Sequence, residues 1–63
     1  MNLEKNIKIK MVVAGIDSKT ELCEMINISR PSLDYIFKKN DCKISTLIKI
    51  AEVLNCSVSD LVQ

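Results

Sequence analysis

The chain has 63 residues, of which 48% are hydrophobic, with one Tyr, one Phe and no Trp. A chain this short closes one small core of aliphatic, Met and Cys side chains, which excludes two domains and favours helices packed on helices. Nine basic residues against eight acidic ones give a charge of +1, so a nucleic-acid partner has to be argued from where the charges lie.

The first predicted helix covers residues 2–14 and ends at Gly15, the preferred residue after a helix. Its apolar side chains recur at helical spacing: Leu3, Ile7, Met11 and Ala14. A second stripe of Ile9, Val12 and Val13 is predicted to be partly buried, and its exposed remainder would suit an interface. The run Ile7 to Lys10 also alternates as a strand would.

A second helix is predicted over residues 18–26, because Ser18 and Glu21 are spaced as a capping box. Its inner stripe is Leu22, Cys23 and Ile26. A third helix is predicted over residues 29–38, with Ser29 as its cap and Pro31 in the first turn, where no amide partner is lost. Its buried face consists of Leu33, Ile36 and Phe37.

The fourth predicted helix covers residues 44–54, and three residues are candidates for its cap: Asp41, Lys43 and Ser45. Its apolar stripe consists of Ile44, Leu47, Ile48, Ala51 and Leu54. A short fifth helix is predicted over residues 58–62, started by Ser57 with Asp60 three residues later. The expected fold is therefore all-α, a compact single domain of five helices over residues 1–63.

The break between the second and third helices is too short for them to run antiparallel, so they have to cross steeply. Glycine is absent there, and Asn is the next best residue in the left-handed conformation. We therefore predict a positive φ at Asn27, and the same left-handed conformation at Asn55 and near Asn40.

This crossing leaves one side of the third helix exposed. At 100° per residue, its outward arc holds Pro31, Asp34, Tyr35, Lys38 and Lys39, with Arg30 and Ser32 at the flanks of the arc near the start of the helix. A helix of this size fits the major groove, where Arg pairs with guanine, Ser and Tyr hydrogen-bond to bases or phosphates, and Pro31 meets a thymine methyl. Ser29 and the first amides of the helix suit a phosphate.

The segment from Ser18 to Val62, "SKTELCEMINISRPSLDYIFKKNDCKISTLIKIAEVLNCSVSDLV", resembles the Cro and lambda-repressor-type helix-turn-helix family, also called the XRE family. The resemblance implies a lambda-repressor-like fold and sequence-specific DNA binding, usually as a homodimer on a partly symmetric double-stranded operator. Such proteins are commonly repressors of phage, mobile-element or bacterial genes. The resemblance implies no catalytic residues and no cofactor.

Residue by residue, the resemblance places base reading on Arg30, Pro31, Ser32 and Tyr35. It places phosphate contacts on Lys19, Thr20, Ser29, Lys38, Lys39, Asn40 and Lys43. The sequence departs from the family pattern at Lys19, Cys23 and Phe37, where Gln, Ala and Glu are common. Pro31 also removes a polar reading group, and Asp34 puts a negative charge beside the expected phosphates.

Several alternatives accompany this interpretation. Arg30 can pair with Asp34 one turn along the helix and read no base, and the lysines can form an ordinary solvated loop. A module of the same fold that binds and modulates another repressor protein also fits the near-neutral charge and the surplus of apolar residues. An enzyme is least expected, because the chain has no His and no activated nucleophile.

Three widely spaced cysteines, Cys23, Cys42 and Cys56, are without a Cys-x-x-Cys pair. They indicate buried thiols in a reducing compartment rather than disulfides or a metal site. Residues 1–10 lack a continuous apolar run long enough for a signal peptide or a membrane span. We therefore expect a soluble, cytoplasmic protein.

Overall fold

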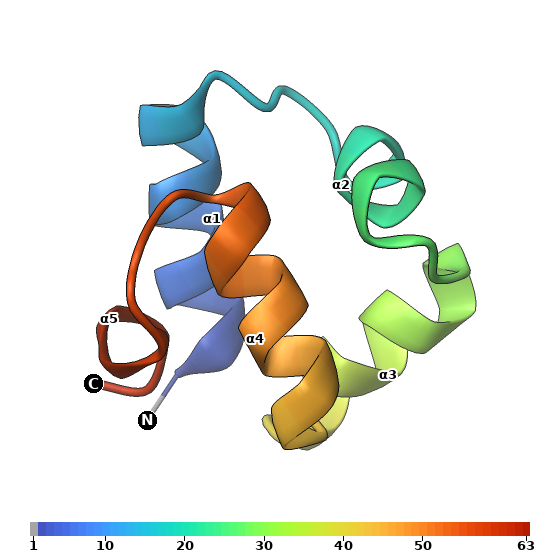
Figure 1. Cartoon of the computed structure of the whole chain (residues 1–63). Helices are drawn as coiled ribbons and strands as arrows, with labels where there is room; N and C mark the ends of the chain where they lie inside the picture. Colours follow the sequence, from blue (N-terminus) through green and yellow to red (C-terminus); the bar gives the residue numbers. More distant parts are fainter. Residues whose placement is uncertain (1) are drawn as a thin grey trace.

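The computed structural model describes residues 2–63, and within them the chain is all-α (Figure 1). The five helices lie within one residue of their predicted ranges at each end. Their bounds are α1 Leu3–Ala14, α2 Lys19–Ile26, α3 Arg30–Lys39, α4 Ile44–Val53 and α5 Val58–Leu61. None of these helices is long and apolar enough to cross a membrane.

Three asparagines and one glycine set the directions of the turns. Gly15 after α1 has φ 77°, and Asn27, Asn40 and Asn55 have φ 59°, 55° and 54°. All four lie in the left-handed region, where a residue with a bulky side chain is strained. The predicted positive φ at Asn27 is therefore confirmed. A left-handed asparagine also follows α3 and α4.

Serine side chains start three of the helices. The hydroxyl of Ser18 accepts from the Glu21 amide at 3.1 Å, and that of Ser29 accepts from the Ser32 amide at 3.2 Å. Lys43 occupies the cap position of α4 and makes no side-chain cap bond, which decides among the three candidates. At α5, Ser57 and Asp60 form a complete capping box.

This capping box predicts an acid-sensitive contribution to stability. The Asp60 carboxylate accepts the Ser57 amide at 3.1 Å, and this bond is the main reason that the pKa of Asp60 lies below its ordinary value of 3.8. A lowered folded pKa means that the contribution is complete above pH 3.8 and is lost as the pH falls through the folded value. Thermal unfolding followed by circular dichroism should therefore depend less on pH below this point in Asp60→Asn than in the wild type. Glu24→Gln, which removes an equal charge at an exposed position of α2, is the matched control. Equal pH profiles for both variants would contradict the prediction.

The core lies where the helices meet. Helix α2 packs against α3 and α4, α1 packs against α3 and α5, and α4 packs against α5. Six side chains are almost fully buried: Leu3, Ile7, Leu22, Leu33, Ile50 and Leu61. In Figure 1, α1 and α5 lie on one side of the molecule and the α2–α3 turn on the other, and the outward residues of α3 are exposed.

The apolar stripes of α1 and α4 are only partly as predicted. The stripe of Ile9, Val12 and Val13 is not core: these side chains are 49%, 79% and 77% exposed. Ala14, at the end of α1, is exposed as well. In each helix apolar residues occupy more than one face, so their spacing alone does not say which face is buried.

In α4 the face that turns inward is centred on Leu47, Ile50, Ala51 and Leu54. Ile44 and Ile48, which the predicted stripe included, are 65% and 43% exposed. The three cysteines are free thiols, but only Cys23 is buried, and Cys42 and Cys56 are half-buried. The prediction of buried thiols was therefore wrong for two of the three.

Candidate nucleic-acid interface

The turn between α2 and α3 makes the two helices cross rather than run side by side (Figure 1). The Ile28 amide donates to the Cys23 carbonyl at 3.0 Å across the left-handed Asn27. The Cys23 thiol, 3% exposed, donates to the Ser29 carbonyl at 3.8 Å. Burial raises the pKa of this thiol, which keeps it protonated as the donor. The buried Cys23 side chain thus links α2 to the start of α3.

The predicted base-reading residues share the outward surface of α3. Arg30, Pro31, Ser32 and Tyr35 are all exposed, and Tyr35 is 62% exposed. Their neighbours Leu33 and Ile36 are buried, so the helix presents a sharp division between its core face and its outer face. The Ser32 hydroxyl lies 2.8 Å from the Ser29 hydroxyl, which links the first turn to its cap.

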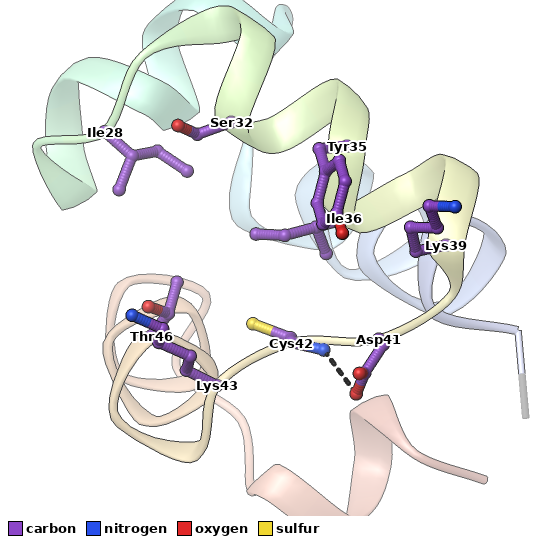
Figure 2. Close-up of a pocket in the computed structure, with 9 residues that line it drawn as sticks. All are labelled: Ile28, Ser32, Tyr35, Ile36, Lys39, Asp41, Cys42, Lys43 and Thr46. Carbon is purple, nitrogen blue, oxygen red and sulfur yellow. Dashed lines mark hydrogen bonds between the residues drawn. The ribbon is translucent and has the colours of Figure 1, made fainter.

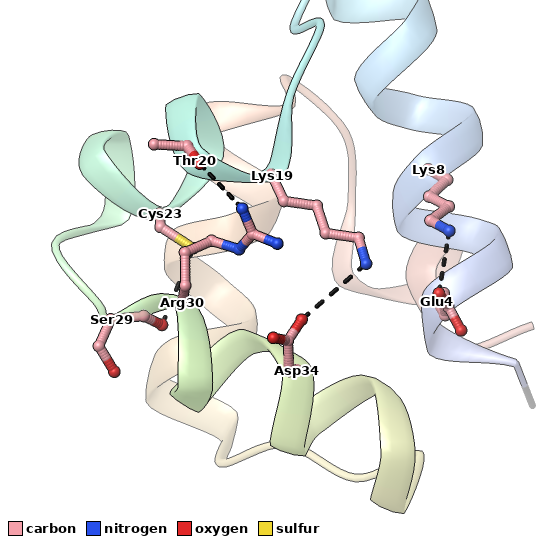
Figure 3. A network of polar contacts seen from close by, with 8 residues as sticks. All are labelled: Glu4, Lys8, Lys19, Thr20, Cys23, Ser29, Arg30 and Asp34. Carbon is pink, nitrogen blue, oxygen red and sulfur yellow. Dashed lines mark hydrogen bonds and ion pairs between the residues drawn. The ribbon is translucent and has the colours of Figure 1, made fainter.

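Arg30 is held by α2 and not by its own helix (Figure 3). Its guanidinium donates to the Thr20 hydroxyl at 2.9 Å. The alternative pairing of Arg30 with Asp34 was wrong, because Asp34 faces Lys19 of α2 at 3.9 Å. Two polar links therefore cross from the start of α2 to the first half of α3.

The Lys19–Asp34 pair changes the expected contribution of both residues to DNA binding. Asp34 is half-exposed and would repel phosphate, but the Lys19 ammonium offsets its charge. The same ammonium lies 5.3 Å from the centroid of the Phe37 ring. Lys19 is consequently engaged between the two helices, so less of its charge is available for a phosphate than the sequence suggests.

A surface hollow of about 710 Å³ separates α3 from the start of α4 (Figure 2). Tyr35 and Lys39 form its α3 wall, and Lys43 lies on the opposite wall. The Lys39 ammonium lies 5.9 Å from the Tyr35 ring centroid. The lining residues are Ile28, Ser32, Tyr35, Ile36, Lys39, Asp41, Cys42, Lys43 and Thr46.

Sequence reasoning missed Ile28, Cys42 and Thr46 as parts of this surface. They come from three separate segments, so no spacing pattern connects them. The only available signal was the position of Thr46 in the first turn of α4, close to Lys43. Burial, and then the charge of Asp41, raise the pKa of the Cys42 thiol, so this cysteine lines the hollow as a neutral thiol.

Asn40 and Lys38 lie at the end of α3 and differ in their surroundings. The Asn40 side-chain oxygen accepts from the Leu3 amide at 2.8 Å, and this bond ties the end of α3 to the start of α1. Lys38 is exposed in the last turn of α3. Among residues 2–63, no hydrogen bond or ion pair links Lys38 or Lys43 to another predicted site residue.

Positive charge gathers on this surface although the whole chain is nearly neutral. Five of the nine basic residues are among the predicted site residues: Lys19, Arg30, Lys38, Lys39 and Lys43. Asp34 and Asp41 are the acidic residues of α3 and the hollow, and Asp34 is paired with Lys19. The placement of charge therefore supports an anionic partner where the net charge does not.

Comparison with known proteins agrees with this geometry. A search of curated proteins and a search of solved structures each found no match. Residues 6–63 match the family model described as the Cro/C1-type HTH DNA-binding domain. With a match over almost the whole sequence, the chain belongs to the Cro/C1-type helix-turn-helix DNA-binding family.

Proposed function

We propose that this protein is a small transcriptional regulator that places α3 in the major groove of double-stranded DNA. One observation carries the proposal. Arg30 stands at the exposed start of α3, on the flank of the helix that faces α2, and is oriented by the Thr20 hydroxyl. In helix-turn-helix proteins, residues near the start of the second helix of the motif, here α3, contact the base edges.

The base-reading role falls on the first two turns of α3. Arg30 has five N–H donors, and one hydrogen bond to Thr20 leaves others for the O6 and N7 atoms of a guanine. Ser32 and Tyr35 supply hydroxyls for bases or phosphates, and Pro31 supplies an apolar contact for a thymine methyl. Arg30 is the strongest candidate for specificity, because bidentate Arg–guanine contacts discriminate best.

Phosphate contacts fit the edges of the same surface. Lys39 and Lys43 lie on opposite walls of the hollow, where they can hold a DNA backbone that runs beside α3. Lys38, Thr20 and Ser29 are the further candidates. Lys19 and Asn40 contribute less, because one pairs with Asp34 and the other bonds to the Leu3 amide.

Within this function, the biological role we favour is that of a repressor of phage, mobile-element or bacterial genes, acting in the cytoplasm. A homodimer on a partly symmetric operator would place two copies of α3 in successive major grooves. A partner-binding module that modulates another repressor is the second candidate. The exposed apolar side chains of α1 favour it, since such patches often mark protein interfaces.

Selection of bound DNA from a random pool at low salt tests the choice between these functions. A DNA regulator should enrich one motif, and its affinity should fall steeply as salt is added, because phosphate contacts release counterions. An empty selection, combined with binding to a repressor protein, would overturn the proposal in favour of the partner-binding module.

Removing a phosphate lysine should weaken binding to every sequence alike. For Lys38→Ala and Lys39→Ala we expect equal losses on the operator and on random DNA, and a decrease of about 1 in the salt slope for each lysine. Fluorescence anisotropy over a range of salt concentrations measures both quantities. Lys10→Ala is the matched control, because Lys10 lies on α1, which carries none of the predicted site residues. A loss confined to the operator would assign these lysines to base reading instead.

A further inference from the structure

We infer that a second copy of this chain packs against the outward face of α1, which we call the α1 outer face and define by Lys5, Ile9, Val12 and Val13. The inference rests on the proposed function in one respect, because a homodimer on a symmetric operator needs such a surface. It adds the surface itself and the orientation of the two copies.

Exposure singles out this face. Val12 and Val13 are 79% and 77% exposed, the two highest values among the large apolar side chains, and Ile9 is 49% exposed. Ile9, Val12 and Val13 are spaced i, i+3 and i+4, so they lie side by side on the helix. The opposite face of α1 is already occupied by Leu3, Ile7 and Met11 in the core. A contiguous apolar strip of this kind is a candidate surface for a protein interface.

The shape of the face suits an antiparallel pair of α1 helices. A shallow hollow of about 430 Å³ lies at the N-terminal half of α1 and is lined mostly by polar residues, Asn2, Glu4, Lys5 and Lys8, together with Ile9. The two valines stand at the C-terminal half. A two-fold axis near the middle of the helix places the valines of each copy beside Ile9 and the aliphatic stems of Lys5 and Lys8 of the other, as an isologous interface requires.

Charge points to the same orientation. The last turn of α1 has no basic residue, so the negative end of its helix dipole lacks a compensating charge from its own turn. The exposed Asp17 follows shortly after. Within residues 2–63, neither Asp17 nor the exposed Lys5 makes an ion pair. Antiparallel packing brings Lys5 of each copy to the end of α1 and to Asp17 of the other.

The other exposed apolar pair suits a dimer less well. Ile44 and Ile48 of α4 are 65% and 43% exposed, but Ile44 directly follows Lys43 and so adjoins the hollow beside α3. In Figure 1 the C-terminal half of α1 lies on one side of the molecule and the α2–α3 pair on the other. The α1 outer face therefore stays accessible while α3 occupies a groove.

The area available sets the strength of the dimer. One helix pair buries less than the roughly 1,600 Å² of a standard protein interface, so the free protein should dimerise weakly. On DNA with two half-sites, the second copy binds at a high effective concentration, and a weak contact then suffices for cooperative binding. We expect a monomer–dimer equilibrium in solution and a dimer on the operator.

Sedimentation equilibrium of the full chain tests the surface. The double variant Val12→Glu, Val13→Glu should raise the dimer dissociation constant about tenfold or more, with an unchanged circular dichroism spectrum, because both side chains are exposed. Ile48→Glu, an equivalent change on α4, is the matched control and should leave the constant unchanged. A wild-type chain that stays monomeric at every concentration, or a dimer broken by Ile48→Glu alone, would overturn the inference.

A charge exchange tests the orientation. Lys5→Glu and Asp17→Lys should each weaken the dimer, and the double variant should recover affinity, because the contact is restored with its charges reversed. Additive losses would overturn the antiparallel arrangement. DNA binding is measured separately on a single half-site, which needs no dimer. Absence of binding to the half-site would contradict the proposed function. A chain that stays monomeric in sedimentation would contradict dimerisation through the α1 outer face.

Discussion

Replacing Arg30 by alanine is expected to weaken binding to the selected operator by about 1–3 kcal/mol and to change binding to random DNA far less. The guanidinium stands at the exposed start of α3, and Thr20 accepts one of its hydrogen bonds at 2.9 Å. A side chain held in this way loses less conformational entropy when it meets a base. Fluorescence anisotropy with operator and random duplexes at one salt concentration measures the difference.

Arg30→Lys is the matched control, because it keeps the charge and removes the planar pair of donors. It should retain binding to random DNA and lose most of the preference for the operator. Operator affinity equal to that of the wild type in both variants would show that Arg30 reads no base. Equal losses on operator and random DNA in Arg30→Ala would make it a phosphate contact.

Thr20 and Arg30 should behave as a coupled pair. Thr20→Val removes the acceptor and nearly preserves the shape of the side chain, so part of the Arg30 contribution should be lost. In a double-mutant cycle, Thr20→Val should then cost less in the absence of Arg30 than in its presence. Strictly additive effects would instead mean that the Thr20 hydroxyl contacts a phosphate and does not position Arg30.

The sequence was most informative where the chemistry is local. Caps such as Ser18 and Ser29 act on amides three residues away, and the left-handed stops use Gly15 and three asparagines. These interactions depend on neighbours in the chain, so the helices were predicted to within a residue of the observed bounds. The exposed positions on α3 followed from the helical period once its buried face was known.

The contacts between helices could not be predicted from the spacing of residues in the sequence. The pairing of Arg30 with Thr20 and of Lys19 with Asp34 depends on the crossing of α2 and α3, whereas the local rule favoured Arg30 with Asp34. The buried face of α4 was predicted with Ile44 and Ile48 because isoleucines surround much of that helix. Which of them faces inward is decided by the packing of α2 and α5 against α4, and that packing is a property of the whole fold.

The hinge at Asn27 should give an ordered series of stabilities. Asn27 has φ 59° and ψ 48°, and its backbone amide donates to the Cys23 and Glu24 carbonyls. A left-handed backbone is easiest for glycine, tolerable for asparagine, and costs about 1–2 kcal/mol for residues with a bulkier Cβ. The free energy of unfolding should therefore decrease in the order Asn27→Gly, wild type, Asn27→Ala, Asn27→Val. Urea denaturation followed by circular dichroism measures the series.

Such a loss is large for this chain, because typical stabilities imply roughly 3–9 kcal/mol for 63 residues. The consequence for function should exceed the consequence for stability. Asn27 sets the angle at which α3 leaves α2, and a changed angle shifts Arg30 relative to Thr20. For Asn27→Val we therefore expect operator affinity to fall even at low temperature, where the folded state still predominates.

Asn55→Val provides the matched comparison. Asn55 has nearly the same φ, 54°, but it connects α4 to α5 and does not set the direction in which α3 leaves α2. The same strain should lower its stability by a similar amount and leave the operator affinity of the folded fraction unchanged. If both valine variants lose operator affinity in proportion to their stability, the Asn27 turn acts through folding alone. If Asn27→Val is as stable as Asn27→Gly, the left-handed conformation is not what ends α2.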